Sequence, residues 1–179
     1  REELPPYITN LALWGVDGHN IGSSDADPAR ARTMEVAAHR FFREALAATH
    51  LTVGRPIESR ETGGWSLTMA RRIRQDGTIT GVASVSARLD ILGRYLAVGT
   101  PGKSSTIITL VDDDGTVLAR AGGTPIAVGT RVRIADRIRR LRDDRSGFID
   151  SVDVRMGGPY AYQRVTAAPW LVIVGRPDE

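Results

Sequence analysis

Three Asp-Gly pairs divide this sequence into short segments, and they constrain its fold more than any other feature. The pairs are Asp17-Gly18, Asp76-Gly77 and Asp114-Gly115, and each lies between two apolar runs that favour β-strands. Asp-Gly between such runs is a strong hairpin signal, because both residues tolerate the positive φ angles of a tight turn. The sequence therefore predicts hairpins that join residues 11–16 to 20–24, 65–73 to 78–87, and 105–111 to 116–121.

The segments between the hairpins alternate between helical and extended patterns. Residues 28–49 are expected to form one helix, with Asp27 as its cap and an apolar stripe that consists of Met34, Ala38, Phe41, Ala45 and Ala48. Residues 51–60 are expected to be extended. Further helices are expected over 89–98 and over the Arg-rich stretch 131–145, which Gly147 would end. The strands expected after them cover 148–154, 160–166 and 170–174.

This order of elements occurs twice. Two strands, a helix and three strands are followed by a linking helix and then by the same series. Because hairpins dominate and strands do not alternate with helices, a parallel doubly wound sheet is unfavourable. The sequence predicts an α+β fold of two tandem domains, each with a mainly antiparallel five-stranded sheet and a helix on one face. The expected limits are 8–88 for the first domain, 89–98 for the linking helix and 104–176 for the second domain.

Composition excludes several classes of function. The chain has no Cys, which excludes disulfide scaffolds, Cys-ligated zinc, iron–sulfur clusters and thiol nucleophiles. Lys and Arg number 24 against 21 Asp and Glu, and a net charge of +3 is too small to indicate nucleic-acid binding. No run approaches the roughly 18–20 apolar residues that span a bilayer. The chain begins with Arg1, and we expect it to be a piece of a longer protein.

Several motifs resemble a known family when they are taken in order. They are the cluster His39-Arg40-Phe41-Phe42-Arg43, the strand that starts at Gly64-Trp65-Ser66, the second Asp-Gly hairpin, and the closing segments 160–165 and 169–175. In this order they are similar to the double Cache (PAS-like) extracytoplasmic sensor domains of bacterial diguanylate cyclases and sensor histidine kinases. The resemblance covers the chain from about residue 11 to residue 176.

The resemblance implies a function and a location. A chain of this family is a periplasmic sensor domain that binds a small solute and is not itself an enzyme, and no cofactor, metal or catalytic residue is expected. Its long N-terminal helix would be mostly absent here, with residues 1–7 as the tail. Flanking helices outside this chain would cross the inner membrane, and the full receptor would be a homodimer. The output domain would be a diguanylate cyclase or a histidine kinase.

The resemblance also implies a ligand pocket between the sheet and the helix of the first, membrane-distal domain. Relatives that bind amino acids use an Arg and aromatic residues after the helix, and an Asp late in the last strand. These positions fall on His39, on Phe41-Phe42 and on Ser86, so both charged anchors are missing and the ligand class stays open. The candidate ligand-binding residues are His39, Phe42, Arg43, Arg60, Trp65, Met69, Arg71, Ser84 and Ser86.

Two interpretations of the arginines stay open. Converging guanidinium groups would suit a carboxylate, sulfonate or phosphate. Alternatively, each Arg pairs internally, with Glu58, Glu61 or Asp90, or extends to solvent. The Arg-rich stretch 131–145 could meet anionic lipid, although a solvated face is the commoner case.

Two other functions compete with the sensor. The chain could be an interaction or dimerisation module that binds no ligand. It could also be a hydrolase that uses His39 with Ser84 and Asp90, but their spacing does not support a triad. Residues 112–115 lack the spacing of a calcium loop, residues 99–104 lack that of a phosphate loop, and the three His residues share no metal-ligand spacing.

Overall fold

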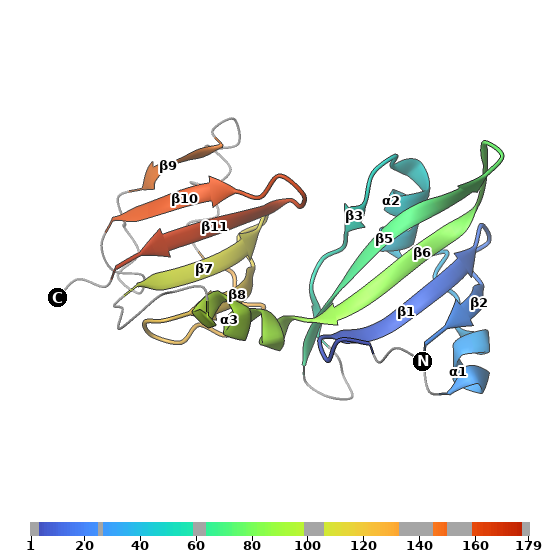
Figure 1. The fold of residues 1–179 in the computed structure, drawn as a ribbon, viewed down its shortest axis with the longest axis horizontal. Helices are drawn as coiled ribbons and strands as arrows, with labels where there is room; N and C mark the ends of the chain where they lie inside the picture. The colour runs from blue at the N-terminus through green and yellow to red at the C-terminus, as the bar shows by residue number, and fades with distance from the viewer. Residues whose placement is uncertain are drawn as a thin grey trace. The chain divides into compact units, whose positions relative to one another are not determined.

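The computed structural model describes residues 4–24, 27–58, 64–98, 106–132, 145–149 and 159–176. These residues fold into two compact units, Arg1–Glu61 with Ser66–Arg88, and Thr62–Trp65 with Leu89–Glu179. Within each unit the dominant element is an antiparallel sheet (Figure 1). In chain order the elements are β1 (Ile8–Gly15), β2 (Asn20–Ser23), α1 (Pro28–Thr33), α2 (Arg40–Ala47), β3 (Thr52–Val53), β4 (Ile57–Glu58), β5 (Trp65–Gln75), β6 (Thr78–Arg88), α3 (Leu89–Val98), β7 (Ile107–Asp112), β8 (Val117–Ala121), β9 (Ser146–Ile149), β10 (Tyr160–Arg164) and β11 (Trp170–Gly175).

All three hairpins predicted from the Asp-Gly pairs are confirmed, as β1–β2, β5–β6 and β7–β8. The first sheet has the strand order β2-β1-β6-β5-β3, and β4 also pairs with β5, so it has six strands where five were expected. The second sheet has the order β8-β7-β11-β10-β9. In both sheets the first strand lies between its hairpin partner and the last strand. The two sheets therefore share one connectivity (Figure 1).

The two units also share a hydrogen bond at the turn of their first hairpin. Gly18 has a φ of +85°, and its carbonyl accepts the Val36 N–H at 2.9 Å. In the second unit Gly115 has a φ of +78°, and its carbonyl accepts the Val132 N–H, also at 2.9 Å. Both valines are buried. In each unit the turn is thus hydrogen-bonded to the chain that follows the hairpin, at a valine whose side chain is buried.

The single helix predicted over residues 28–49 is wrong, because this bond interrupts it. α1 and α2 are separate helices, and the residues between them pair with the first hairpin instead. The Met34 carbonyl accepts the Asn20 N–H at 3.3 Å, and Val36 bonds to Gly18. The apolar residues predicted to form one helical stripe therefore lie partly in an extended segment, residues 34–37, that is hydrogen-bonded to the first hairpin.

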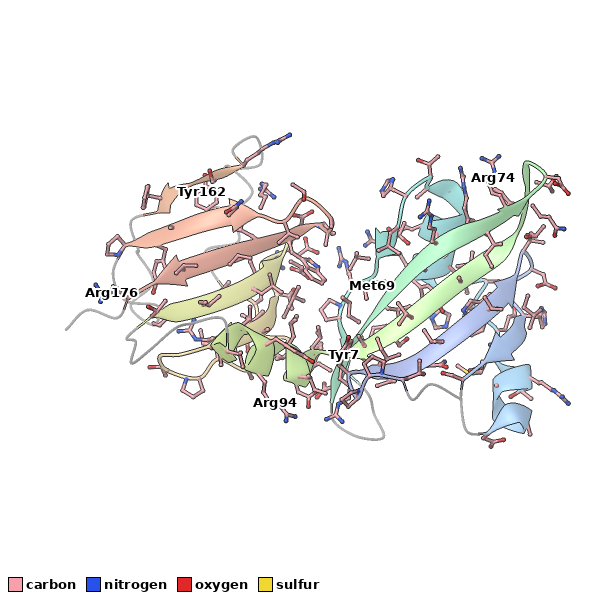
Figure 2. All side chains as sticks on the ribbon, in the orientation of Figure 1. Tyr7, Met69, Arg74, Arg94, Tyr162 and Arg176 are labelled. Atoms are coloured by element: carbon pink, nitrogen blue, oxygen red, sulfur yellow. The ribbon has the colours of Figure 1, made fainter. Side chains whose placement is uncertain are left out.

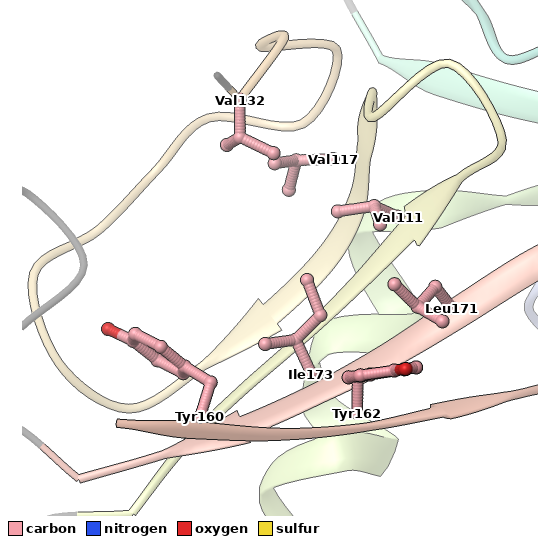
Figure 3. Close-up of a cluster of buried hydrophobic side chains, with 7 residues drawn as sticks. All are labelled: Val111, Val117, Val132, Tyr160, Tyr162, Leu171 and Ile173. Atoms are coloured by element: carbon pink, nitrogen blue, oxygen red, sulfur yellow. The ribbon is translucent and has the colours of Figure 1, made fainter. Parts of the chain in front are cut away.

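In each unit, a cluster of buried hydrophobic side chains lies on one face of the sheet. In the first unit α2 lies on this face, which we call the first inner face (Figure 1). Its core consists of Ala12, Trp14, Val36, Phe42, Ala45, Ala70 and Val82. The second core defines the second inner face (Figure 3), and it consists of Val111, Val117, Val132, Tyr160, Tyr162, Leu171 and Ile173.

Some expectations from the sequence concern residues outside the described ranges. They are Arg60, residues 133–144 of the Arg-rich helix and residues 150–154 of the strand after it. The helix expected over 89–98 is confirmed as α3, which packs against β8 of the second unit. Gly147 lies inside β9 rather than at the end of a helix. Among the described residues, no helix has the length and the apolar character that a bilayer crossing requires.

Candidate functional site

The first inner face changes from apolar to polar along its strands. Residues directly opposite each other in antiparallel strands point to the same face. Trp14 lies opposite Val82, and Ala12 lies opposite Ser84 one step further along. The next step brings together Asn10 and Ser86 of adjacent strands, and Ser86 also lies opposite Thr68 of β5. We call Asn10, Ser23, Thr68 and Ser86 the polar row.

Hydrogen bonds link the members of the polar row. The Thr68 and Ser86 hydroxyl oxygens lie 3.1 Å apart, and the Ser23 hydroxyl donates to Asn10 Oδ1 at 2.9 Å. All four side chains are half-buried. Hydroxyl groups donate and accept hydrogen bonds, and an amide offers both kinds of group, so this row consists of neutral hydrogen-bonding side chains.

Ser84 stands between the polar row and the core. Its Oγ accepts a hydrogen bond of 2.8 Å from Trp14 Nε1, and Trp14 is only 3% exposed. A buried indole N–H needs a hydrogen-bond acceptor, and the Ser84 hydroxyl oxygen provides it. The structure thus brings Ser84 and Ser86, two of the expected site residues, together on the first inner face.

The residues expected on α2 differ from one another in burial. Phe42 is 2% exposed and forms part of the core, so its ring packs against the sheet. His39 and Arg43 are exposed. The His39 ring stands edge-on to Phe41, with ring centroids 5.9 Å apart. In the part of the chain that the structure describes, none of these three candidates forms a hydrogen bond with the polar row, whose members lie on the strands.

Met69 and Arg71 do not lie with Ser84 and Ser86, and grouping them in one site was wrong. Met69 pairs with Val85, and Arg71 pairs with Ala83, so both project from the outer face of the sheet. Figure 2 labels Met69 on β5. The reason is the alternation of side chains along a strand, by which each neighbour of an inward residue faces outward. The exposed Arg71 cannot contribute to a site on the first inner face.

Trp65 belongs to the second compact unit, although it begins β5. Its indole ring occupies the place where a side chain at Gly129 would lie. Gly129 has a φ of +86°, so its backbone conformation as well as this close packing favours glycine. Trp65 is therefore a packing residue of the second unit.

Arg72 is the arginine that reaches the first inner face, and the sequence reasoning missed it. It lies opposite Val82, and its Nη1 donates to the carbonyls of Leu46 and Ala47, each at 3.3 Å. These carbonyls end α2, where the helix leaves acceptors without intrahelical partners. The signal that could have found it is the alternation of side chains along a strand. Arg72 lies two residues after Ala70 and four after Thr68, so these three side chains share one face of β5, and Met69 lies on the other.

Replacing Arg72 with methionine should destabilise the chain, whereas Arg71→Met should not. Arg72→Met removes both bonds to the end of α2, and we expect it to lower the free energy of unfolding by about 1 kcal/mol. Arg71→Met should change it by less than about 0.5 kcal/mol, as for most exposed positions. Urea denaturation of both variants measures the difference. Equal losses would contradict the assignment of the two residues to opposite faces.

Among the residues that the structure describes, no group of three or more His, Asp or Glu side chains is placed to hold a metal ion. Asp17 lies exposed at the first turn. The backbone N–H of His19 donates to its carboxylate at 3.1 Å, and this bond lowers the pKa of Asp17. The first unit's site is therefore built from neutral polar groups.

Comparison with known proteins establishes the fold. No protein-family model and no curated protein sequence matches the chain. Among solved structures, it is similar to the extracellular domain of a protein described as a histidine kinase, rpHK1S-Z16, with 22% identity and a TM-score of 0.76 over 97% of this chain and 72% of that one.

Two chemoreceptor domains share the same architecture. One is the ligand-binding domain of the Pseudomonas aeruginosa amino acid chemoreceptor PctC in complex with GABA (19% identity, TM-score 0.56, 94% of this chain and 74% of that one). The other is that of the Pseudomonas fluorescens chemoreceptor CtaA in complex with L-serine (17% identity, TM-score 0.63, 95% and 73%). The chain therefore has the fold of the extracellular sensor domains of histidine kinases and chemoreceptors.

Proposed function

We propose that this chain is the extracytoplasmic ligand-sensing domain of a bacterial transmembrane receptor, and that its two units are tandem PAS-like (Cache) domains. The first unit binds a small polar solute at the polar row. The receptor is a homodimer anchored in the inner membrane by helices outside this chain, and it signals to a diguanylate cyclase or histidine kinase. The fold shared with extracellular sensor domains supports this proposal.

The observation that carries the proposal is the polar row itself. The Trp14 end of this face is covered by apolar side chains. At the other end, Ser84, Ser86 and Thr68 set hydroxyl groups on adjacent strands beside that apolar core. Small-molecule sites commonly combine an apolar lining with a few convergent polar groups.

Three arginines of the first unit make no hydrogen bond to the polar row in the part of the chain that the structure describes. Arg43 is exposed, Arg71 lies on the outer face and Arg72 bonds to the end of α2. None of these guanidinium groups points to the polar row. A solute bound there would be recognised through hydrogen bonds from hydroxyl and amide groups. If the sheet and the helix can pack in two ways, the solute shifts the balance between these two conformations only by the difference between its affinities for them.

One observation favours the alternative of an interaction module that binds no ligand. The polar row is internally hydrogen-bonded, since Thr68 pairs with Ser86 and Ser23 pairs with Asn10. A solute must compete with these bonds. A domain that uses the row only to hold its own strands would need no solute.

Titration calorimetry of the full chain against a broad panel of small polar metabolites, L-serine and GABA among them, separates the two functions. If the row binds a solute, at least one member of the panel should bind the wild-type chain. Thr68→Val keeps the side-chain volume and removes the hydroxyl, so it should weaken that binding about tenfold, the equivalent of roughly 1.4 kcal/mol. Thr78→Val is the matched control, because Thr78 is exposed at the far end of the same hairpin. No binding by the wild-type chain, or equal losses in both variants, would favour the interaction module.

A further inference from the structure

Arg120 carries a positive charge to the second inner face. It lies opposite Thr109 of β7, which is 0% exposed, and Thr109 lies opposite Ile173 of β11. Ile173 belongs to the second core, so these three side chains share the face that is otherwise apolar. An arginine at such a position requires partners for its charge and for its five N–H donors.

The partners that Arg120 has in the structure use only part of its hydrogen-bonding capacity. Its Nη1 donates to the Thr109 hydroxyl at 2.6 Å, and its Nε donates to the Thr124 carbonyl at 3.0 Å. Its Nη2 is buried and has no hydrogen-bond partner in the part of the chain that the structure describes. Within the same residues, no carboxylate forms an ion pair with this guanidinium.

The surroundings of Arg120 make this unmet capacity costly. Burial lowers the pKa of Arg120, and the nearby Tyr160 acts in the opposite direction. Tyr160 is 1% exposed, as its position in Figure 3 within the second core illustrates. A half-buried charge with a buried unpaired donor loses hydration without full compensation. An anion placed against Nη2 would supply both the missing acceptor and the missing charge.

Because the two sheets share one connectivity, Arg120 in the second sheet corresponds to Ser23, a member of the polar row, in the first. In the first sheet Ala12 pairs with Ser23, and in the second Thr109 pairs with Arg120 at the same step from the hairpin turn. Ser23 belongs to the polar row of the first unit. The same position of the fold therefore carries a neutral hydroxyl in one unit and a guanidinium in the other.

We propose that Arg120 anchors a second ligand site, on the second inner face, that takes the carboxylate of a small monocarboxylate. One guanidinium balances one negative charge, so a monoanion fits better than a phosphate dianion. Ile107 and Ile173 are buried beside this position and make its surroundings apolar. The site is independent of the proposed function of the first unit, because it uses none of the residues of the polar row.

Titration of the full chain with sodium propionate tests the site, with sodium phosphate as the competing anion. Propionate should bind the wild-type chain and raise its melting temperature. Arg120→Met should weaken propionate binding at least tenfold, because it keeps the length of the side chain and removes every N–H donor. Arg71→Met, which removes an exposed guanidinium from the other unit, should bind propionate like the wild type. Stronger binding of phosphate than of propionate would overturn the monocarboxylate assignment.

A measurement on the wild-type chain keeps the proposal testable if Arg120→Met does not fold. Amide NMR signals that respond to propionate should come from residues 106–132 and 159–176, whereas those that respond to L-serine should come from residues 8–24 and 64–88. An absence of propionate-induced changes, or changes confined to the first unit, would overturn the second site. Failure of every polar solute in the panel to bind, with propionate binding intact, would count against the function proposed for the first unit alone.

Discussion

Phe42→Ala should lower the free energy of unfolding by about 3–5 kcal/mol, whereas Phe41→Ala should cost clearly less. Phe42 is 2% exposed and packs among Trp14, Ala45 and Val82 in the first core. Truncating it removes an aromatic ring from a closely packed interior and leaves a cavity that the strands can fill only in part. Phe41 is only partly buried and packs against the same core from outside, so its truncation leaves a space that solvent can reach.

Urea denaturation of both variants, followed by circular dichroism, measures these losses. The two phenylalanines are adjacent on α2, so each serves as the control for the other in helix propensity and expression. The comparison also decides the role of Phe42. If Phe42 were a ligand contact rather than a core residue, its truncation would change affinity and leave stability near that of the wild type. A larger loss for Phe41→Ala would contradict the packing of α2 described above.

Gly18→Ala should destabilise the chain by about 3 kcal/mol or more, whereas Gly77→Ala should cost about 1 kcal/mol. Both glycines follow an aspartate in a hairpin turn, with φ angles of +85° and +81°. An alanine pays the same conformational cost at both. The surroundings differ, because a Cβ at Gly18 would lie 2.5 Å from the Ala37 backbone nitrogen, and a Cβ at Gly77 would meet no atom within 4 Å.

Thermal and urea unfolding of the two variants isolate the effect of that close approach. The difference between their losses is the cost of moving the segment that the first turn binds through Val36. This segment connects α1 to α2, so its displacement should also loosen the helix on the first inner face. Equal losses would show that residues 34–37 yield to the added methyl group, and that the first turn is no more constrained than the second.

Local signals in the sequence were sufficient for the hairpins. A tight turn depends on the backbone freedom of two adjacent residues, and the strands on either side depend on short apolar runs, so Asp76-Gly77 specifies β5–β6 without reference to the rest of the chain. The repeated order of elements follows from the same local signals. It predicted two antiparallel sheets, and the structure shows them with a common strand order.

The positions of site residues depended on contacts between distant parts of the chain. Residues 28–49 carry a helical pattern, but the carbonyl of Gly18 takes the Val36 N–H out of that helix. Arg71 and Arg72 are neighbours of equal chemistry, and pairing with β6 decides that Arg72 faces α2. A one-residue change of parity moves a side chain to the opposite face, and no property of the arginines themselves indicates which one faces inward.

By itself, the sequence determined the three Asp-Gly turns, the strands that flank them and α3, since these depend on residues close together in the chain. It also placed Ser84 and Ser86 on one face, because they are two residues apart in a single strand. Only the tertiary structure decided that Phe42 is core, that Trp65 packs in the second unit and that Arg120 is half-buried beside Thr109. The burial and the strand partners of a residue depend on packing between segments far apart in sequence. The type of a single residue does not indicate which segments it will contact.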